Sequence, residues 1–232
     1  PTEVLKSGIE KIVPQLAPTE AAFELAARGM MTTDTHPKQS TRTAVIGGKT
    51  VRVSGCSKGA ADQYVRDYAR IYELPTTVYR QSCIYGYRQF GVEDQGWVAW
   101  FVIAAVLGRP ITIYGNGKQV RDVLFVDDLV EAYLAAIARP ETVAGKIFNV
   151  GGGPENTMSV WAEFGPMLEE LIGRPVSVAH GDWRPGDQPV YISDIRKIAR
   201  ELGWQPKIAV RDGVQKLYEW VAAHRDLFKI LG

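Results

Sequence analysis

The chain has 232 residues, of which 46% are hydrophobic and 23% charged, and its formal net charge is +1. This balance is typical of a globular protein that buries a core, and it provides no basic surface for nucleic acid or anionic lipid. The two cysteines, Cys56 and Cys83, allow no disulfide framework, and no apolar run approaches the roughly 18–20 residues of a membrane helix. We therefore expect a cytoplasmic, enzyme-like protein with no nucleic-acid or membrane partner.

The first 53 residues are weakly patterned. A short helix is expected over residues 21–27, a polar stretch without periodicity over 32–43, and an edge strand over 50–53. We expect residues 5–50 to be mostly irregular or weakly docked.

Strong patterning begins at Gly55, and helical and strand periods then alternate. The expected elements are a helix at 57–71 capped by Ser57, a strand at 76–79, a helix at 97–107, strands at 111–114 and 122–126, a helix from Asp127 or Asp128 to 137, a strand at 146–150, a helix at 159–172, a strand at 176–179, and helices at 195–202 and 210–228. This alternation favours an α/β fold with parallel strands.

The aromatic residues and the histidines of the chain carry no sign of a binding platform or a metal site. Trp97, Trp100 and Phe101 share one helical face, which predicts a place in the core. The three histidines, His36, His180 and His224, are isolated from Cys, Asp and Glu at ligand spacing, so no metal site is expected.

Four segments carry recognisable motifs: residues 55–64 (GCSKGAADQY), 79–86 (YRQSCIYG), 115–122 (GNGKQVRD) with 126–128 (VDD), and 184–188 (RPGDQ) followed by Asp194. Together they resemble the extended short-chain dehydrogenase/reductase family, in particular its NAD-dependent nucleotide-sugar epimerases and dehydratases. The second segment, continued to Trp97, is most similar to CDP-paratose/CDP-tyvelose 2-epimerases.

The resemblance implies an α/β fold with an incomplete Rossmann-type parallel sheet and a smaller α/β substrate-binding domain. Residues 1–54 would be a degenerate or diverged remnant of the cofactor domain, and residues 55–96 the last part of the Rossmann-type domain. Residues 97–232 would form mainly the substrate-binding domain, with the chain returning to the Rossmann-type domain.

The family's cofactor is NAD, held by a glycine-rich turn before a helix. No G-x-x-G-x-x-G occurs here, since residues 47–48 and 151–153 lack its spacing or its place in the order. The chain also begins at Pro1 and not at a methionine. We therefore expect the dinucleotide-binding half to be absent upstream, and residues 5–53 to be either frame-displaced or diverged.

The resemblance places the family's Tyr–Lys pair at Ser54 and Lys58. Four-residue spacing puts both side chains on one helix face, where the ammonium lowers the pKa of a phenol so that it can accept a sugar proton. A serine hydroxyl is not a competent base there, so we expect no turnover by this chain. Lys58 is assigned to the cofactor ribose, and the alternative is a solvated helix residue.

Two arginines match the family residues that contact the substrate diphosphate: Arg121 and Arg184. A guanidinium fork suits two phosphate oxygens, and we expect both groups to reach one pocket. The alternative for Arg121 is a surface ion pair with Asp122.

Further positions match the substrate-lining parts of the family. Tyr85 and Arg88 follow a strand end and are assigned to the substrate. Ser82, in the same turn, is assigned to the cofactor, and it stands where most relatives have asparagine. Asn149 ends a strand, where α/β folds place ligand groups, and its alternative role is to stabilise a turn.

The implied activity is transient oxidation of a nucleotide-linked hexose by NAD, followed by return of the hydride. A 2-epimerase would oxidise C2 of a CDP-linked deoxyhexose. Two alternatives stay open: a nucleotide-sugar 4,6-dehydratase, and a non-catalytic module that binds a nucleotide-diphosphate sugar or forms a homodimer through the helix starting at Ser57.

Overall fold

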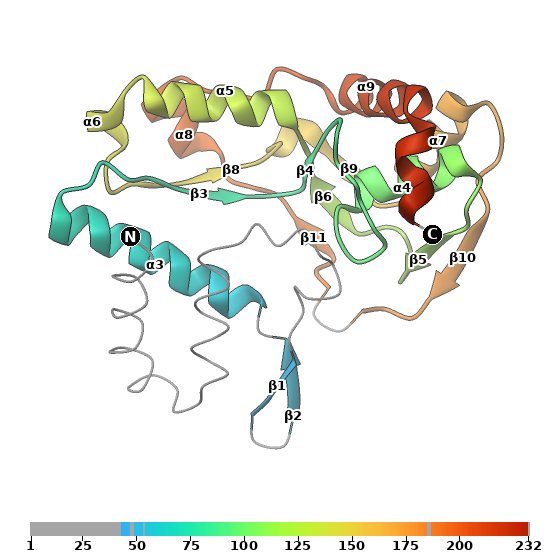
Figure 1. Ribbon diagram of the computed structural model, residues 1–232, viewed down its shortest axis with the longest axis horizontal. Helices are drawn as coiled ribbons and strands as arrows, with labels where there is room; N and C mark the ends of the chain where they lie inside the picture. The colour runs from blue at the N-terminus through green and yellow to red at the C-terminus, as the bar shows by residue number, and fades with distance from the viewer. Residues whose placement is uncertain (1–42, 47–48, 53, 185–186, 232) are drawn as a thin grey trace. The chain divides into compact units, whose positions relative to one another are not determined.

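The computed structural model describes residues 43–46, 49–52, 54–184 and 187–231, and their side chains over 58–184 and 187–228 (Figure 1). The chain divides into two compact units. The first unit comprises Pro1–Val78 with Ala144–Lys146, and the second comprises Tyr79–Val143 with Ile147–Gly232. The domain borders expected from the sequence, at residues 54 and 96, remain predictions.

The first unit contains an antiparallel strand pair, of which the sequence predicted only the second strand. Strand β1 (Thr43–Ile46) pairs with β2 (Lys49–Arg52), so the strand expected at 50–53 has a partner on the preceding segment. The strand expected at 50–53 is confirmed for residues 50–52, and the expectation of irregular structure is wrong for residues 43–46 and 49. The helix expected at 21–27 lies outside the described residues.

Helix α3 (Ser54–Tyr72) follows this pair and starts three residues before the predicted cap at Ser57. The prediction relied on the preference of serine for caps, but serine and glycine also occupy helix interiors at a modest cost in free energy. The earlier start places the backbones of Ser54 and Lys58 on one helix with four-residue spacing, as the family motif requires.

The second unit contains short strands that pair in four small sheets. Parallel pairing, as predicted, joins β4 (Ile84–Tyr85) to β7 (Leu124–Phe125) and β5 (Ile111–Tyr114) to β10 (Val178–Gly181). Strand β3 (Val78–Gln81), whose first residue belongs to the first unit, pairs with β8 (Ile147–Val150).

The fourth sheet carries the motif at 115–122. Its middle strand is β6 (Val120–Asp122), with β11 (Val190–Tyr191) parallel on one edge and β9 (Thr157–Ser159) antiparallel on the other (Figure 1). The single strand predicted at 122–126 is therefore wrong. The run of β-branched and apolar residues is divided between β6 and β7, which pair with different partners.

Helix α4 (Trp97–Leu107) matches its prediction residue for residue. Gly96 and Gly108, both with positive φ, bound a segment without a polar side chain other than the indole nitrogens. The helix is buried among α7 (Phe164–Ile172) and α9 (Val210–Ala223), with Phe101 and Val102 at 5% and 0% exposure. We call this core the α4 cluster. Of the aromatic residues expected in the core, Phe101 belongs to this cluster, whereas Trp97 and Trp100 are partly buried and pack against it.

A second core lies between α5 (Val126–Ile137), α8 (Arg196–Leu202) and strand β8, and we call it the α5 cluster. Helices α5 and α8 lie on one side of β3 and β8 (Figure 1). Asp128 does not cap α5 with its side chain. Its carboxylate accepts the backbone N–H groups of Lys207 and Ile208 at 3.1 and 3.0 Å, and its carbonyl accepts the indole N–H of Trp204 at 2.9 Å.

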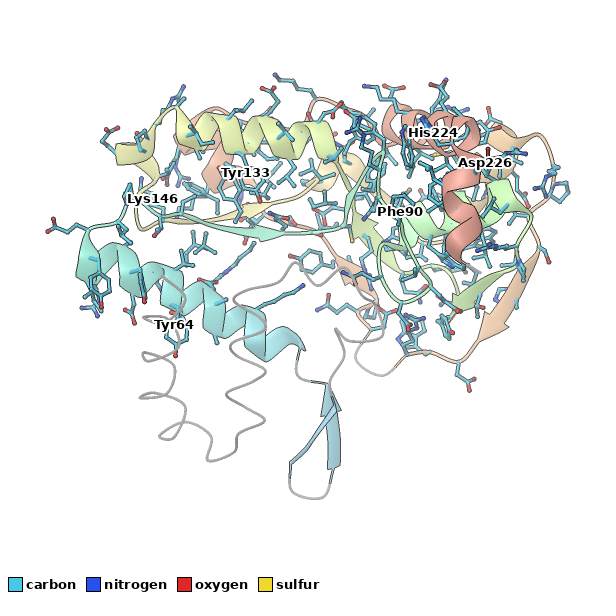
Figure 2. All side chains as sticks on the ribbon, viewed as in Figure 1. Tyr64, Phe90, Tyr133, Lys146, His224 and Asp226 are labelled. Carbon is cyan, nitrogen blue, oxygen red and sulfur yellow. The ribbon has the colours of Figure 1, made fainter. Side chains whose placement is uncertain are left out.

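Two other helix boundaries differ from the prediction. Ser159 ends β9, and α7 starts only at Phe164, because Ser159 and Glu163 bond each other's backbone N–H reciprocally and hold a turn between them. The last helix ends at Ala223 and is followed by a 3₁₀ segment, Arg225–Leu231, instead of continuing to 228. Phe90 and His224 lie near this end of the chain, where Phe90 packs against Trp220 and Phe228 (Figure 2).

Candidate functional site

The glycine turn at 115–117 follows the carboxyl end of β5. Gly115 has φ 77°, and a Cβ there would lie 2.5 Å from the Trp183 ring, so the residue must be glycine on both counts. Behind this turn, the Gln119 side chain is 2% exposed and donates a hydrogen bond to the Tyr114 carbonyl at 2.7 Å. The turn and the loop after β10 are thus packed directly on each other.

Arg121 lies on the middle strand of its sheet and is largely buried, with 13% of its side chain exposed. Its Nη2 donates to Asp187 Oδ1 at 2.6 Å, and Nη1 donates to the Val120 carbonyl at 2.8 Å. These contacts use two of the five N–H donors of a guanidinium. The pairing with Asp122 considered from the sequence is wrong, because successive side chains of a strand point to opposite faces.

Arg184 is held by a ring and a carboxylate. Its Cζ lies 3.8 Å from the centroid of the Tyr114 ring, and its Nη2 lies 3.1 Å from Asp94 Oδ1. Stacking on an aromatic face fixes the plane of a guanidinium while leaving its edge accessible. Arg184 is 28% exposed.

Asp187 connects the two arginines. Its carboxylate binds Arg121, and it also accepts a 3.4 Å hydrogen bond from Gln119. Its backbone N–H donates to the Arg184 carbonyl at 3.1 Å, and its own carbonyl accepts the indole N–H of Trp183 at 3.3 Å. Asp187 thus links Arg121 on β6 to the loop that carries Arg184, and the expectation that both guanidinium groups reach one pocket remains a prediction. The sequence motif contained Asp187, but its role as partner of Arg121 was not predicted, because 66 residues separate the two.

Ser82 and Asn149 occupy supporting positions. Ser82 is 7% exposed, and its hydroxyl donates to Asp122 Oδ1 at 2.8 Å. Asn149 donates a 3.4 Å hydrogen bond to the Asp194 carbonyl, beside the ion pair of Asp194 with Arg196. Bonding to Arg196 lowers the pKa of Asp194 to about 2. The ligand contacts predicted for Ser82 and Asn149 remain predictions.

Tyr85 and Arg88 differ in accessibility. Tyr85 is 2% exposed, packs edge-on against Phe125, and donates its hydroxyl to the Val210 carbonyl at 3.2 Å. Burial raises the pKa of this phenol, so the hydroxyl is a donor at neutral pH. Arg88 is exposed and has a positive φ of 63°. The described geometry gives Tyr85 a packing role, and only Arg88 of the two is accessible to a ligand.

Replacing Tyr85 by phenylalanine is expected to lower the free energy of unfolding by about 1 kcal/mol, the net value of one buried hydrogen bond. Nucleotide affinity should stay unchanged, because the ring and its packing on Phe125 are kept. Urea unfolding and calorimetric titration measure the two quantities. If Tyr85→Phe bound nucleotide more weakly while its stability stayed unchanged, the result would support the direct substrate contact that the sequence predicted for Tyr85.

Two parts of the chain are relevant to binding of the NAD that the family resemblance implies: helix α3 and the glycine turn at 151–153. Lys58 is exposed on α3, whereas the Ser54 side chain lies outside the described residues. The turn at 151–153 does not fit a dinucleotide pyrophosphate. A Cβ on Gly151 would lie 2.5 Å from Ser193 Oγ, one on Gly152 would lie 2.8 Å from Asn156 Cβ, and only a three-residue 3₁₀ segment follows. The space around these glycines is filled by protein.

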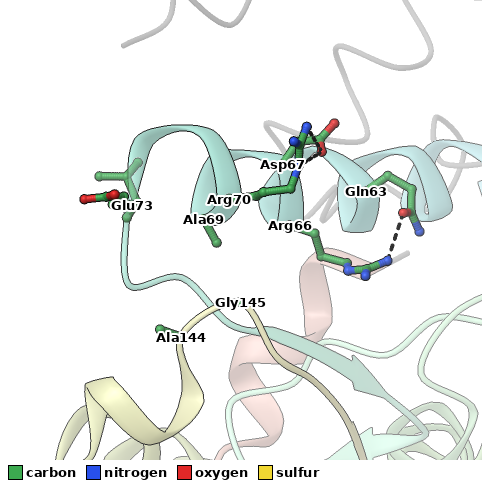
Figure 3. Close-up of a pocket in the computed structure, with 9 residues that line it drawn as sticks. Gln63, Arg66, Asp67, Ala69, Arg70, Glu73, Ala144 and Gly145 are labelled. Atoms are coloured by element: carbon green, nitrogen blue, oxygen red, sulfur yellow. Dashed lines mark hydrogen bonds and ion pairs between the residues drawn. The ribbon is translucent and has the colours of Figure 1, made fainter.

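A hollow of about 510 Å³ lies in the first unit between α3 and the loop before β8 (Figure 3). Its walls carry charges of both signs, and the arginines already bond to neighbours on the same helix: Arg66 to Gln63 at 3.2 Å and Arg70 to Asp67 at 3.3 Å. This mixture does not select an anion or a cation, and we assign no function to the hollow.

Metal-ligand clusters and membrane-spanning helices are absent from the residues that the structure describes. No group of three or more His, Cys, Asp and Glu side chains among them could hold a metal ion. None of the helices in the described part of the chain has the length and apolarity needed to cross a bilayer.

Comparison with known proteins identifies the family. The model of the NAD dependent epimerase/dehydratase family matches residues 29–151, more than half of the chain. The chain belongs to the NAD-dependent epimerase/dehydratase family. The match extends into the weakly patterned segment before Ser54, and it contains Lys58, Ser82, Arg121 and Asn149.

The individual proteins to which this chain is similar include the two kinds of enzyme expected from the sequence, a 2-epimerase and a 4,6-dehydratase. The chain is 45% identical to the CDP-paratose 2-epimerase of Salmonella typhi over 174 residues, which are 73% of this chain and 51% of that protein. It is 36% identical to the dTDP-glucose 4,6-dehydratase of Neisseria gonorrhoeae, covering 71% of this chain and 49% of the relative. The predicted resemblance to 2-epimerases and dehydratases of this family is confirmed, and the chain spans about half the length of these relatives.

Solved structures of the epimerase/dehydratase family share the fold. The UDP-glucose 4-epimerase of Thermotoga maritima, solved with UDP-glucose, superposes with a TM-score of 0.67 at 31% identity, covering 78% of this chain and 56% of that chain. A dTDP-glucose 4,6-dehydratase of Streptomyces venezuelae, solved with NAD and TYD, gives 0.68 at 26% identity, covering 80% and 56%. The predicted α/β, Rossmann-type class is thereby confirmed.

Proposed function

We propose that the chain binds the diphosphate of a nucleotide sugar through Arg121 and Arg184. The observation that carries this proposal is the loop at 184–187, where Asp187 bonds both the Arg121 guanidinium and the Arg184 backbone. Two guanidinium groups, Arg121 on β6 and Arg184 on the loop that Asp187 ties to it, suit the oxygens of a diphosphate. Solved relatives with UDP-glucose and TYD support the ligand class.

We propose further that the activity of the whole protein is that of an NAD-dependent 2-epimerase acting on a CDP-linked deoxyhexose. The identity of 45% to a CDP-paratose 2-epimerase supports this choice over the alternative, a 4,6-dehydratase acting on a dTDP-sugar, where identity is 36%. Bound NAD would supply the transient oxidation of the sugar, and the protein would position and protonate it.

Within this chain, Lys58 is the residue that suits the cofactor. Its exposed ammonium on α3 would hold ribose hydroxyls when NAD is bound. Ser54 stands in place of the family's tyrosine, and its hydroxyl is far less acidic than a phenol. The described residues therefore support binding and positioning more directly than proton transfer.

The second candidate function is a nucleotide-sugar-binding module without catalysis, associating as a homodimer through α3. The half-buried Ala61, Val65 and Tyr68, with exposed Ile71 and Tyr72 after them, give this helix apolar positions suited to association. Sedimentation at several concentrations tests association, and a monomer throughout would exclude it.

Calorimetric titration of the purified chain with CDP, dTDP and inorganic phosphate tests the proposed ligand. CDP is expected to bind at least about tenfold more tightly than phosphate, a difference of about 1.4 kcal/mol, because base and ribose add contacts to those of the diphosphate. No heat with CDP at millimolar concentration would refute the proposal. Preference for dTDP over CDP would favour the dehydratase alternative.

The same preparation distinguishes the enzyme from the module. Absorbance of bound NAD together with conversion of a CDP-deoxyhexose would establish the epimerase. Nucleotide binding without NAD would establish the module. A Ser54→Tyr variant is the matched control for proton transfer, since it restores the phenol and leaves Arg121 and Arg184 unchanged.

A further inference from the structure

Asp122, the last residue of β6, is fully buried, with 0% exposure. Its carboxylate accepts hydrogen bonds from the Ser82 hydroxyl at 2.8 Å and from the Gly153 backbone N–H at 3.1 Å. Neither partner carries a charge. Burying a carboxylate with neutral partners costs free energy compared with an apolar residue, so stability alone does not account for an aspartate here.

The contacts of Asp122 join three segments of the second unit. Ser82 follows β3, Gly153 belongs to the turn after β8, and Asp122 ends β6. Two backbone hydrogen bonds reinforce the junction: Ser82 N–H donates to the Val150 carbonyl at 3.1 Å, and Val123 N–H donates to the Asn156 carbonyl at 2.9 Å. A Cβ on Gly151 would meet Asp122 Oδ2, so the turn packs directly on the carboxylate.

Arg121 precedes Asp122 in the same strand and points to the opposite face, toward Asp187. In the sheet, Arg121 is in register with Tyr191 of β11 and Met158 of β9. The direction of its guanidinium therefore depends on how the end of β6 is held, and the Asp122 carboxylate is the side chain that ties this end to Ser82 and to the turn at Gly153.

We infer that Asp122 is a positioning residue for the diphosphate site: it fixes the end of β6 so that Arg121 presents its guanidinium to the ligand. The inference rests on the proposed function for its ligand. It assigns Asp122 no contact with substrate, because the carboxylate is buried on the face away from Asp187.

Hydrogen exchange tests the geometric part without a ligand. The amides to follow are Gly153, which donates to Asp122, and Val120, which donates to the Pro189 carbonyl across the β6–β11 pair at 2.9 Å. In Asp122→Ala both are expected to exchange at least about tenfold faster, while Leu217 in the α4 cluster keeps its rate. Asp122→Asn, which retains an acceptor for Gly153, should stay within about threefold of the wild type. Unchanged protection of Val120 in Asp122→Ala would overturn the inference.

CDP titration tests the coupling to Arg121. Asp122→Ala is expected to bind CDP about tenfold more weakly than the wild type, and the same change in an Arg121→Ala background should cause no further loss. Equal losses in both backgrounds would mean that Asp122 acts generally on stability, and would refute positioning. If the wild type binds no CDP, the proposed function fails by itself, and the exchange of Val120 still decides the geometric part.

Asp128 provides the matched control. It is also a buried aspartate, 3% exposed, with two backbone N–H partners, but these lie at Lys207 and Ile208. Asp128→Ala should leave both Val120 exchange and CDP affinity unchanged, because the contacts that it removes lie at a different junction of the unit.

Discussion

Arg121→Ala is expected to weaken CDP binding by about 100-fold, which corresponds to roughly 2.7 kcal/mol. The variant loses charge-assisted hydrogen bonds to the diphosphate, and it leaves the Asp187 carboxylate without the cation that now lies 2.6 Å away. Arg121→Lys should lose about tenfold, because an ammonium keeps the charge without the planar fork. Calorimetric titration at fixed salt measures all three proteins.

Two controls separate the possible causes of this loss. Arg211→Ala removes an exposed arginine that pairs with Glu170 on the surface, so its CDP affinity should equal that of the wild type. The double variant Arg121→Ala, Asp187→Ala removes the uncompensated carboxylate as well. If the double variant bound CDP like the wild type, the loss would come from repulsion by Asp187, and Arg121 would not contact the diphosphate.

Phe164→Ala is expected to lower the free energy of unfolding by about 3–5 kcal/mol. Phe164 is fully buried in the α4 cluster, with ring centroids 5.5 Å from Trp97 and 6.0 Å from Phe101, and truncation leaves a cavity between helices. The melting temperature should fall by roughly 6–20 °C for a chain of this size. Thermal and urea unfolding followed by circular dichroism measure the change.

Phe90→Ala is the matched control for this effect. Phe90 is 44% exposed and contacts Phe228 with one side of its ring, so the same chemical change removes much less buried area (Figure 2). We expect a loss of about 1 kcal/mol. Equal losses for Phe164 and Phe90 would contradict the packing described for α4 and α7.

Local signals were sufficient for some elements. Helix α4 was predicted to the residue because its apolar run is bounded by Gly96 and Gly108, and both adopt the positive φ that ends such runs. Other boundaries depend on contacts that periodicity does not encode. Ser159 and Glu163 hold a turn where a helix was expected, and the division between β6 and β7 depends on partners distant in sequence.

The candidate site shows the same limit. The order and sequence of the motifs were enough to predict Arg121 and Arg184 as diphosphate ligands, since each lies in a segment that resembles a family motif. It was not enough to find that Asp187 holds Arg121, or that Tyr85 is enclosed by the core. Both facts depend on which segments meet in space, and the paired residues are 66 and 125 positions apart.

The apolar character of α4 has a consequence for biosynthesis. The helix is complete at Leu107, but α7 and α9, which bury it, end only at Ile172 and Ala223. At about 5–20 residues per second, a ribosome needs roughly 5–20 s to synthesise the chain from the end of α4 to the end of α9. During that interval a nascent chain presents a segment rich in tryptophan, valine and alanine with nothing to pack against. Production of this protein should therefore benefit from chaperones that bind exposed apolar segments, and slower translation should lengthen the interval in which they are needed.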